Sequence, residues 1–160
     1  MRQLKTEFSD QITQQNVLSK YPRPSLVRSS YLNLNGLWQY AITKDDAIPQ
    51  RFDGQILVPF SPESALSGVS RQLMPDETLW YLRSLPAGRP TGNRRLLLHF
   101  GAADQRAQGF INRKEAGSHM GGYLPFTLDI TKLMSDEENE LLVKITDVSN
   151  TSWHSRGKQS

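Results

Sequence analysis

Short apolar runs separated by turn residues recur along the chain from about residue 33 onward. Clusters of Gly, Pro, Asn and Asp stand between these runs, as is typical of consecutive β-strands. The predicted strands span residues 37–42, 55–58, 79–85, 95–100, 108–112, 123–130 and 140–146. No segment between them repeats its apolar residues at helical spacing, which disfavours a parallel sheet connected by helices. The pattern therefore predicts an all-β protein.

The run from residue 140 to 146 shows the alternation of a strand most clearly. Successive side chains of a strand point to opposite faces of the sheet. One face carries Leu141, Val143 and Ile145, and the other carries Leu142, Lys144 and Thr146. A half-buried strand of this kind belongs to a two-layer β-sandwich. Short helical turns are expected only around residues 62–66 and 131–134.

The first twenty residues are predicted to form an arm outside the sandwich. Leu4, Phe8 and Ile12 have the spacing of one helical stripe, but two turn residues interrupt it, so this arm is expected to be a short helix or disordered. Pro22 and Pro24 then force extended geometry on the residues before them. We therefore expect an arm over residues 1–20 and a β-sandwich domain over residues 21–160.

Composition excludes several classes of function. Nineteen basic and sixteen acidic residues give a net charge of +3, but these charges are scattered, so no nucleic-acid partner is expected. The absence of Cys excludes disulfides, thiolate zinc sites and cysteine nucleophiles. The chain has no signal peptide and no apolar run of bilayer length, so we expect no membrane partner. A cytoplasmic location is expected for the chain as it stands, with secretion through a signal outside it left open.

The titratable residues form no recognisable catalytic or metal motif. Of the three histidines, His99 is predicted to be structural and His154 to be exposed, and their spacing is not that of a metal site. Loop carboxylates suited to calcium are present, but they lack EF-hand spacing. The paired carboxylates fall in polar turns, where solvated charges are expected rather than a glycosidase pair. We predict no catalytic residue, no metal and no cofactor.

Several stretches, taken in order, resemble one family. They are residues 21–42, 56–69, 79–86, 95–105, 117–131 and 146–159. Together they resemble the N-terminal β-sandwich domain of glycoside hydrolase family 2, the family of β-galactosidases, β-glucuronidases and β-mannosidases. The resemblance implies a jelly-roll sandwich of the galactose-binding-domain-like type. It also implies that an immunoglobulin-like domain and a (β/α)₈ barrel follow, and that the barrel holds both catalytic glutamates of a retaining mechanism.

The resemblance further implies that this chain is an inactive fragment of a larger retaining O-glycosyl hydrolase, with its sandwich truncated at the C-terminal end. Its partners would be carbohydrate, in the full enzyme, and its own downstream domains. A sandwich without its last strands exposes edges, so self-association is also expected. By match of motif, the candidate sugar-rim or interdomain contacts are His119, Trp153, Arg156, Lys158 and Gln159. An interdomain contact is the favoured role for each of them.

The sequence departs from the family pattern at three places. Arg113 stands where a turn glycine is usual, Gln105 where a Trp commonly follows the Asp, and Leu82 where an Arg is usual. Because type I′ turns favour Asn-Gly, we expect the hairpin at residues 112–115 to be looser or built on another turn. A free-standing carbohydrate-binding module is the alternative function, and a nucleic-acid binder is the weakest one. The sequence does not indicate which glycoside is the substrate of the full enzyme.

Overall fold

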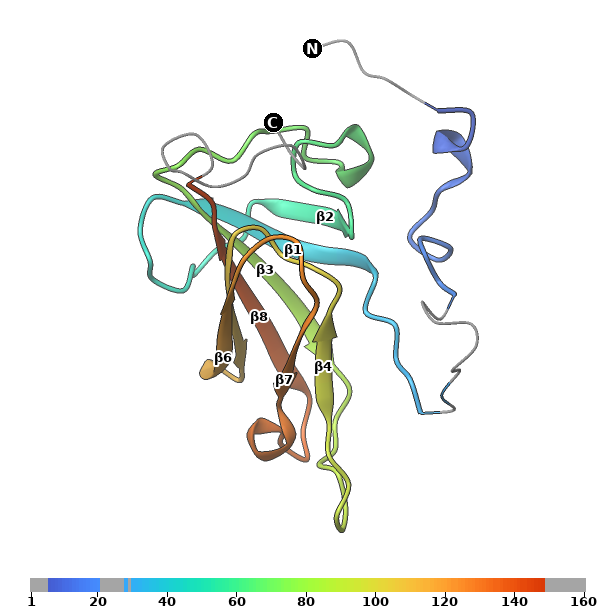
Figure 1. Cartoon of the computed structure of the whole chain (residues 1–160), viewed down its shortest axis with the longest axis vertical. Helices are drawn as coiled ribbons and strands as arrows, with labels where there is room; N and C mark the ends of the chain where they lie inside the picture. The colour runs from blue at the N-terminus through green and yellow to red at the C-terminus, as the bar shows by residue number, and fades with distance from the viewer. Residues whose placement is uncertain (1–5, 21–27, 29, 149–160) are drawn as a thin grey trace. The chain divides into compact units, whose positions relative to one another are not determined.

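The computed structural model describes residues 6–20, 28 and 30–148, and strands dominate it (Figure 1). The strands of this part are β1 (Gly36–Thr43), β2 (Gly54–Val58), β3 (Thr78–Leu85), β4 (Leu97–Phe100), β5 (Arg106–Ile111), β6 (Lys114–Met120), β7 (Phe126–Asp129) and β8 (Asn139–Thr146). Its helices are the 3-10 turns η1 (Ser9–Gln11), η3 (Ala65–Ser67) and η4 (Thr131–Leu133). The all-β prediction is confirmed.

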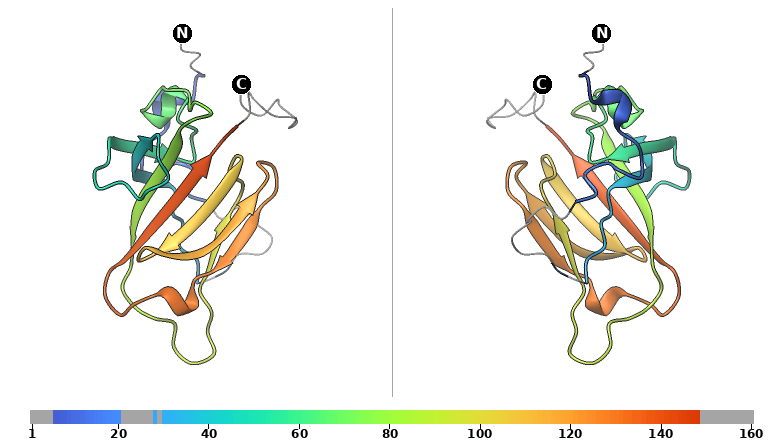
Figure 2. Two further views of the ribbon diagram at one scale, coloured as in Figure 1. Left: turned by 90° about the vertical axis from the view of Figure 1, so that its left-hand side faces the viewer. Right: turned by 90° about the vertical axis from the view of Figure 1, so that its right-hand side faces the viewer.

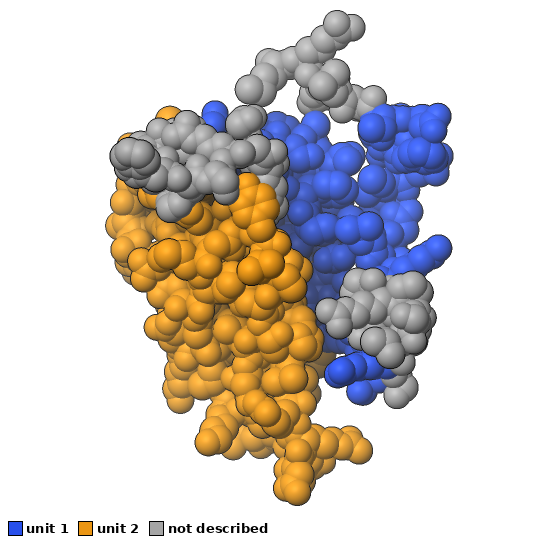
Figure 3. Space-filling view, in the orientation of Figure 1, with its two compact units in different colours: residues 1–38, 55–72 blue, residues 39–54, 73–160 orange. Residues whose placement is uncertain are grey.

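The chain forms two compact units (Figure 3). One unit comprises Met1–Trp38 and Gln55–Gln72, and the other comprises Gln39–Gly54 and Leu73–Ser160. The predicted arm over residues 1–20 stays a prediction. In its described part, η1 is a single turn and Phe8 is exposed, so no apolar helical stripe forms there. No helix of the described residues has the length and apolar character needed to span a membrane.

Strand β8 holds the centre of the large sheet, whose order is β2-β1-β3-β8-β5-β6. It pairs antiparallel with β3 on one side and with β5 on the other. The half-buried strand that the alternation predicts is only partly observed. Leu142 lies on the same face as Lys144 and Thr146, yet it is only 1% exposed. Leu82 and Phe110 flank it on the two neighbouring strands and help to bury it.

Strands β4 and β7 form a second, two-stranded sheet that packs on the large one (Figure 2). Gly109 and Gly117 face each other across the β5–β6 pair, and Leu128 of β7 fills the space above them. A β-carbon on Gly109 would lie 2.6 Å from Leu128 Cδ1, and one on Gly117 would lie 3.0 Å from Cδ2. The β-sandwich prediction is confirmed, and the two layers are in close contact at this point.

A two-residue turn at Asn112 and Arg113 joins β5 to β6. Both residues have positive φ, 51° and 65°, which is the requirement of a type I′ turn. The expectation of a looser or different turn is therefore wrong. The turn keeps its type although Arg113 replaces glycine, and the strain falls on a residue whose side chain is exposed at the tip of the hairpin.

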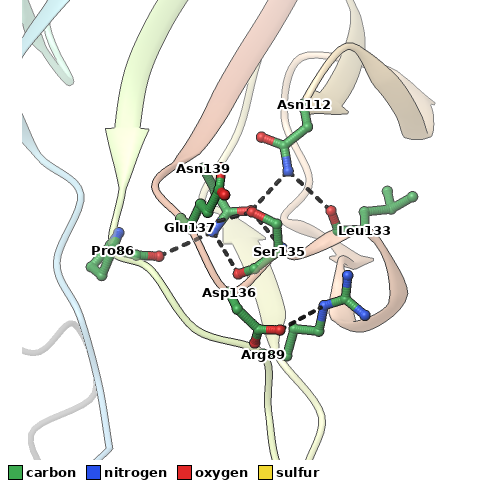
Figure 4. A network of polar contacts seen from close by, with 8 residues as sticks. All are labelled: Pro86, Arg89, Asn112, Leu133, Ser135, Asp136, Glu137 and Asn139. Carbon is green, nitrogen blue, oxygen red and sulfur yellow. Dashed lines mark hydrogen bonds and ion pairs between the residues drawn. The ribbon is translucent and has the colours of Figure 1, made fainter.

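A buried polar network ties this hairpin to the start of β8 (Figure 4). The Nδ2 atom of Asn112 donates to Asn139 Oδ1 at 2.8 Å, and Asn112 Oδ1 accepts from Glu140 N at 2.9 Å. Asn139 is 1% exposed and donates through Nδ2 to the carbonyls of Pro86, Ser135 and Glu137. Its Oδ1 also accepts from the main chain of Ser135 at 2.7 Å. The side-chain amide of Asn139 thus donates to three loop carbonyls that form no hydrogen bonds within the sheet.

Candidate contact site around His119

Of the predicted site residues, only His119 lies in the described part of the chain. Trp153, Arg156, Lys158 and Gln159 fall outside the described residues, and their roles stay predictions. The site can therefore be built from His119 and the segments around it, which are β6, β7, β4 and the loops of residues 101–105 and 121–125.

His119 lies within β6, one residue before its end. It pairs with Ala107 of β5 and shares a face with Gly117, so its side chain points toward β7. Its ring stacks on Phe126 with centroids 4.4 Å apart and planes at 11°. Phe126 stacks in turn on Phe100 at 4.6 Å. Three rings therefore form one column that joins β6, β7 and β4.

The Nε2 atom of His119 is buried and makes no hydrogen bond to any described residue. The nearby Gly121 offers no side chain, and a β-carbon built on it would lie 3.9 Å from Nε2. A buried polar atom without a partner costs about 1–3 kcal/mol. Stacking favours an aromatic ring here, but the nitrogen itself brings no stability within these residues.

The loop after His119 is fixed at two glycines. The N–H of Gly121 donates to the carbonyl of Gln105 at 2.8 Å, and Gly121 has a φ of 117°. The carboxylate of Asp104 lies directly against Gly122 and leaves no room for a β-carbon. On this fixed loop and at the end of β6, three large side chains are exposed. They are Met120, Tyr123 and Leu124, at 70%, 53% and 68%.

His99, the other described histidine, has the surroundings of a structural side chain. It is exposed on β4, opposite Thr127 of β7, and its Nδ1 lies 2.8 Å from Thr127 Oγ1. This hydrogen bond links the two strands of the small sheet.

The described carboxyl groups with shifted pKa values are all shifted downward. A hydrogen bond from Lys144 lowers the pKa of Asp46, and one from Lys44 lowers that of Asp76. The hydroxyl and N–H of Thr131, together with Arg95, lower the pKa of Asp129 from 3.8 to about 2. A general acid requires the opposite shift, because it must hold its proton near neutral pH. The described residues also contain no cluster of three metal-ligating side chains.

Asp104 is the residue of this site that sequence reasoning missed. It contributes by its position against Gly122, which depends on two loops far apart in the sequence. The adjacent glycines at 121 and 122 are the signal that could have pointed to it, because paired glycines often mark a close approach of two chain segments.

No family model matches the chain. Among curated relatives, a β-glucuronidase from Paenibacillus borealis is 25% identical over 138 residues, which are 81% of this chain and 23% of the relative. A β-glucuronidase from Bacteroides fragilis is 44% identical over 52 residues, 32% of this chain and 8% of the relative. The chain thus spans less than a quarter of the length of these relatives.

Solved β-glucuronidase structures share the fold. The enzyme from Ruminococcus gnavus in complex with D-glucaro 1,5-lactone matches 76% of this chain and 23% of its own, with a TM-score of 0.59 and 21% identity. The Bifidobacterium dentium enzyme complexed with coumarin-3-O-glucuronide matches 70% and 19%, with a TM-score of 0.53 and 26% identity. These likenesses show a shared β-sandwich fold. Together with the relatives, they support its assignment to glycoside hydrolase family 2, the family that its motifs resemble.

Proposed function

We propose that the chain is a non-catalytic domain of a family 2 glycoside hydrolase that acts on β-glucuronides. One observation carries the proposal. Structures of β-glucuronidases match about three quarters of this chain, yet the match covers less than a quarter of each enzyme. The chemistry of glycoside cleavage would then reside in the remaining three quarters, in a (β/α)₈ barrel that follows an immunoglobulin-like domain.

Two ion-paired carboxyl groups among the described residues are consistent with a non-catalytic role. Asp46 and Asp129 form ion pairs with Lys144 and Arg95, at 2.7 and 2.6 Å, and their pKa values are lowered. A retaining glycosidase needs one carboxylic acid that stays protonated beside a carboxylate about 5 Å away. Side chains held as ionised partners of Lys and Arg are suited to fixing loops.

The surroundings of His119 support a contact role within such an enzyme. The end of β6 and the fixed loop after it present Met120, Tyr123 and Leu124, of which only Tyr123 carries a polar group. A surface of this composition suits another protein domain better than a hydroxyl-rich sugar, which needs several hydrogen-bonding groups. We therefore favour an interdomain contact at His119 over direct sugar contact.

Two measurements test the proposed function. The purified chain should release no 4-nitrophenol from 4-nitrophenyl β-D-glucuronide above the uncatalysed rate, and measurable turnover would contradict the non-catalytic role. The coding sequence after residue 160 should continue in frame into a barrel with two glutamates. A stop codon at that point would contradict the proposal that the chain is a domain of a larger enzyme.

Calorimetry separates this proposal from a free-standing carbohydrate-binding module. We expect no heat of binding when glucuronate, galactose or mannose is titrated into the chain. Saturable binding of one of these sugars, combined with a stop codon after residue 160, would favour the module instead.

A further inference from the structure

The small sheet has an edge at β4 whose main-chain groups point away from β7. The carbonyl of Leu96 accepts from Ile130 N at 3.1 Å. Hydrogen-bonded and non-bonded pairs alternate along an antiparallel ladder, so Leu98 and Phe100 are the next residues bonded to β7. The N–H and C=O groups of Leu97 and His99 therefore point to the other edge. The 2.8 Å contact between the side chains of His99 and Thr127 agrees, because non-bonded pairs bring side chains closest.

This edge has the properties that permit strand addition. In the part of the chain that the structure describes, β4 pairs with β7 alone. Among these residues, no main-chain hydrogen bond joins Leu97 or His99 to a turn or loop. The strand Leu97–Phe100 carries no Lys, Arg, Asp or Glu, and such side chains are what usually protect an exposed edge.

The edge of the large sheet at β6 is protected by contrast. A register shift between Gly109 and Phe110 bends the β5–β6 pair, and Lys114 and Glu115 are exposed at the start of β6. Bulges and charged side chains both discourage pairing with another strand. Of these two edges, β4 is the one left open to a partner.

We propose that a second copy of this chain pairs antiparallel with β4, so that Leu97 lies opposite His99 of the second copy and His99 lies opposite its Leu97. Both positions are outward-facing, so each forms a bonded pair and the two pairs give four main-chain hydrogen bonds. The two-fold axis passes at Leu98, and the four strands form one sheet in the order β7-β4-β4-β7. An extended strand added to a free edge is a common mode of recognition, and a two-fold contact of this kind is self-complementary.

Charge and strand length select this register. Shifting the axis to Leu97 would place His99 opposite Arg95, before the start of β4, and shifting it to His99 would place Leu97 opposite Gly101, beyond the end. In the proposed register the two Arg95 residues are separated by about 20 Å along the strands, at roughly 3.3 Å per residue. That distance exceeds the screening length of about 8 Å at physiological salt. Arg95 is also paired with Asp129 of its own chain.

The contact is short, because β4 contains four residues. Interfaces well below 1,200 Å² are characteristic of weak association, so we expect a dimer that depends on concentration. Sedimentation equilibrium of the chain should give an average mass that rises from 18.2 kDa toward twice that value as concentration increases. A constant mass of one chain across the whole concentration range would overturn the proposal.

Charge pairs test the register directly. The double variant Leu97→Lys with His99→Lys places like charges opposite each other twice and should abolish the rise in mass. The double variant Leu97→Lys with His99→Glu places opposite charges there and should retain it, with the introduced lysine facing Asp129 of its own chain. If both variants lose the dimer, or both keep it, the register is wrong. Met74→Lys is the control, because it adds the same charge at an exposed apolar side chain outside β4 and should leave association unchanged.

Circular dichroism and thermal unfolding first establish that each variant is folded. Hydrogen exchange on the unaltered chain then tests the edge even if a variant unfolds. The amides of Leu97 and His99 should exchange quickly at low concentration and be protected at least tenfold at high concentration. Strong protection at low concentration, in the monomer, would show that the chain's own residues already occupy the edge and would refute the proposal.

Discussion

The carboxylate of Asp104 occupies the place where a β-carbon on Gly122 would stand. This contact joins the loop before β5 to the loop after β6, beside the hydrogen bond from Gly121 to Gln105. The exposed side chains of the second loop therefore depend on the position of the first.

Gly122→Ala should destabilise the chain by about 1–3 kcal/mol, because one loop must move to accept the methyl group. Denaturant unfolding measures this loss. Gly101→Ala is the matched control in the same region, since nothing lies within 4 Å of its added carbon, and its effect should stay within about 0.5 kcal/mol. Adding Asp104→Ala to Gly122→Ala should recover part of the loss. Strict additivity of the two changes would show that this contact is not the cause.

His119→Phe should stabilise the chain by about 1 kcal/mol. The substitution keeps the stack on Phe126 and removes a buried nitrogen that has no hydrogen bond among the described residues. Thermal unfolding of the two proteins gives the comparison. A loss of stability would mean that Nε2 has a partner after all, and a gain would mean that the histidine is retained for something other than stability.

Arg113→Gly should raise the free energy of unfolding by roughly 0.5–1 kcal/mol, because Arg113 has a φ of 65° and glycine adopts that geometry without strain. The ion pair with Glu140 that is lost is long, at 3.5 Å, and exposed on the Arg113 side, but Glu140 Oε1 is buried without a hydrogen bond, so its loss offsets part of the gain. Urea unfolding is the measurement. Lys114→Gly, one residue later and inside β6, should lower stability instead. Equal effects of the two changes would contradict a type I′ turn.

Asn139→Asp should cost about 2–4 kcal/mol at neutral pH, because a carboxylate would replace the amide that donates to three carbonyl oxygens. Burial and these oxygens raise the pKa of the introduced group in the folded state. Its protonation on acidification therefore favours folding, and the deficit should shrink between pH 7 and pH 4. Unfolding at several pH values against the unaltered chain tests this, and a deficit independent of pH would argue against the network.

Asp129 should make the stability of the folded chain decrease as the pH falls from about 4 to 2. Its pKa is depressed from 3.8 to about 2, so its stabilising contribution is complete above pH 4 and is lost as the pH falls toward 2. Asp129→Asn should remove that part of the pH dependence, and Thr131→Val should remove only some of it because Arg95 remains. Thermal unfolding between pH 2 and pH 5 provides the comparison. Identical acid profiles for all three proteins would refute this role of Asp129.

The apolar runs were sufficient to predict most strands, because burial of one face dominates in those segments. Strand β6 was missed, since the sequence from Lys114 to Met120 contains Lys, Glu, Ala and Gly, which are poor strand formers, and no Val, Ile, Thr, Phe, Tyr or Trp. Its structure comes from the turn at Asn112 and from pairing with β5, and neither can be read from local periodicity. The burial of Leu142 was missed for a similar reason, because it depends on which strands flank β8.

The candidate site also combines features that the sequence indicates with features that only the fold determines. The motif singled out His119, but the column of rings that His119 forms with Phe126 and Phe100 arises from three strands separated in the sequence. The position of Asp104 against Gly122 likewise depends on how two loops meet. Residue types and local spacing were informative about which segments matter, whereas their mutual contacts required the fold.

The central position of β8 has a consequence for how the sheet assembles. Strands β3 and β5 do not pair with each other, and each pairs with β8, which comes last among the described strands. During synthesis the two halves of the sheet would therefore remain separate, with open edges, until the polypeptide had grown to Thr146. Pairing between residues 78 and 146 also links distant parts of the chain, which slows folding. The interval before β8 is inserted is when mispairing with other chains is most favoured.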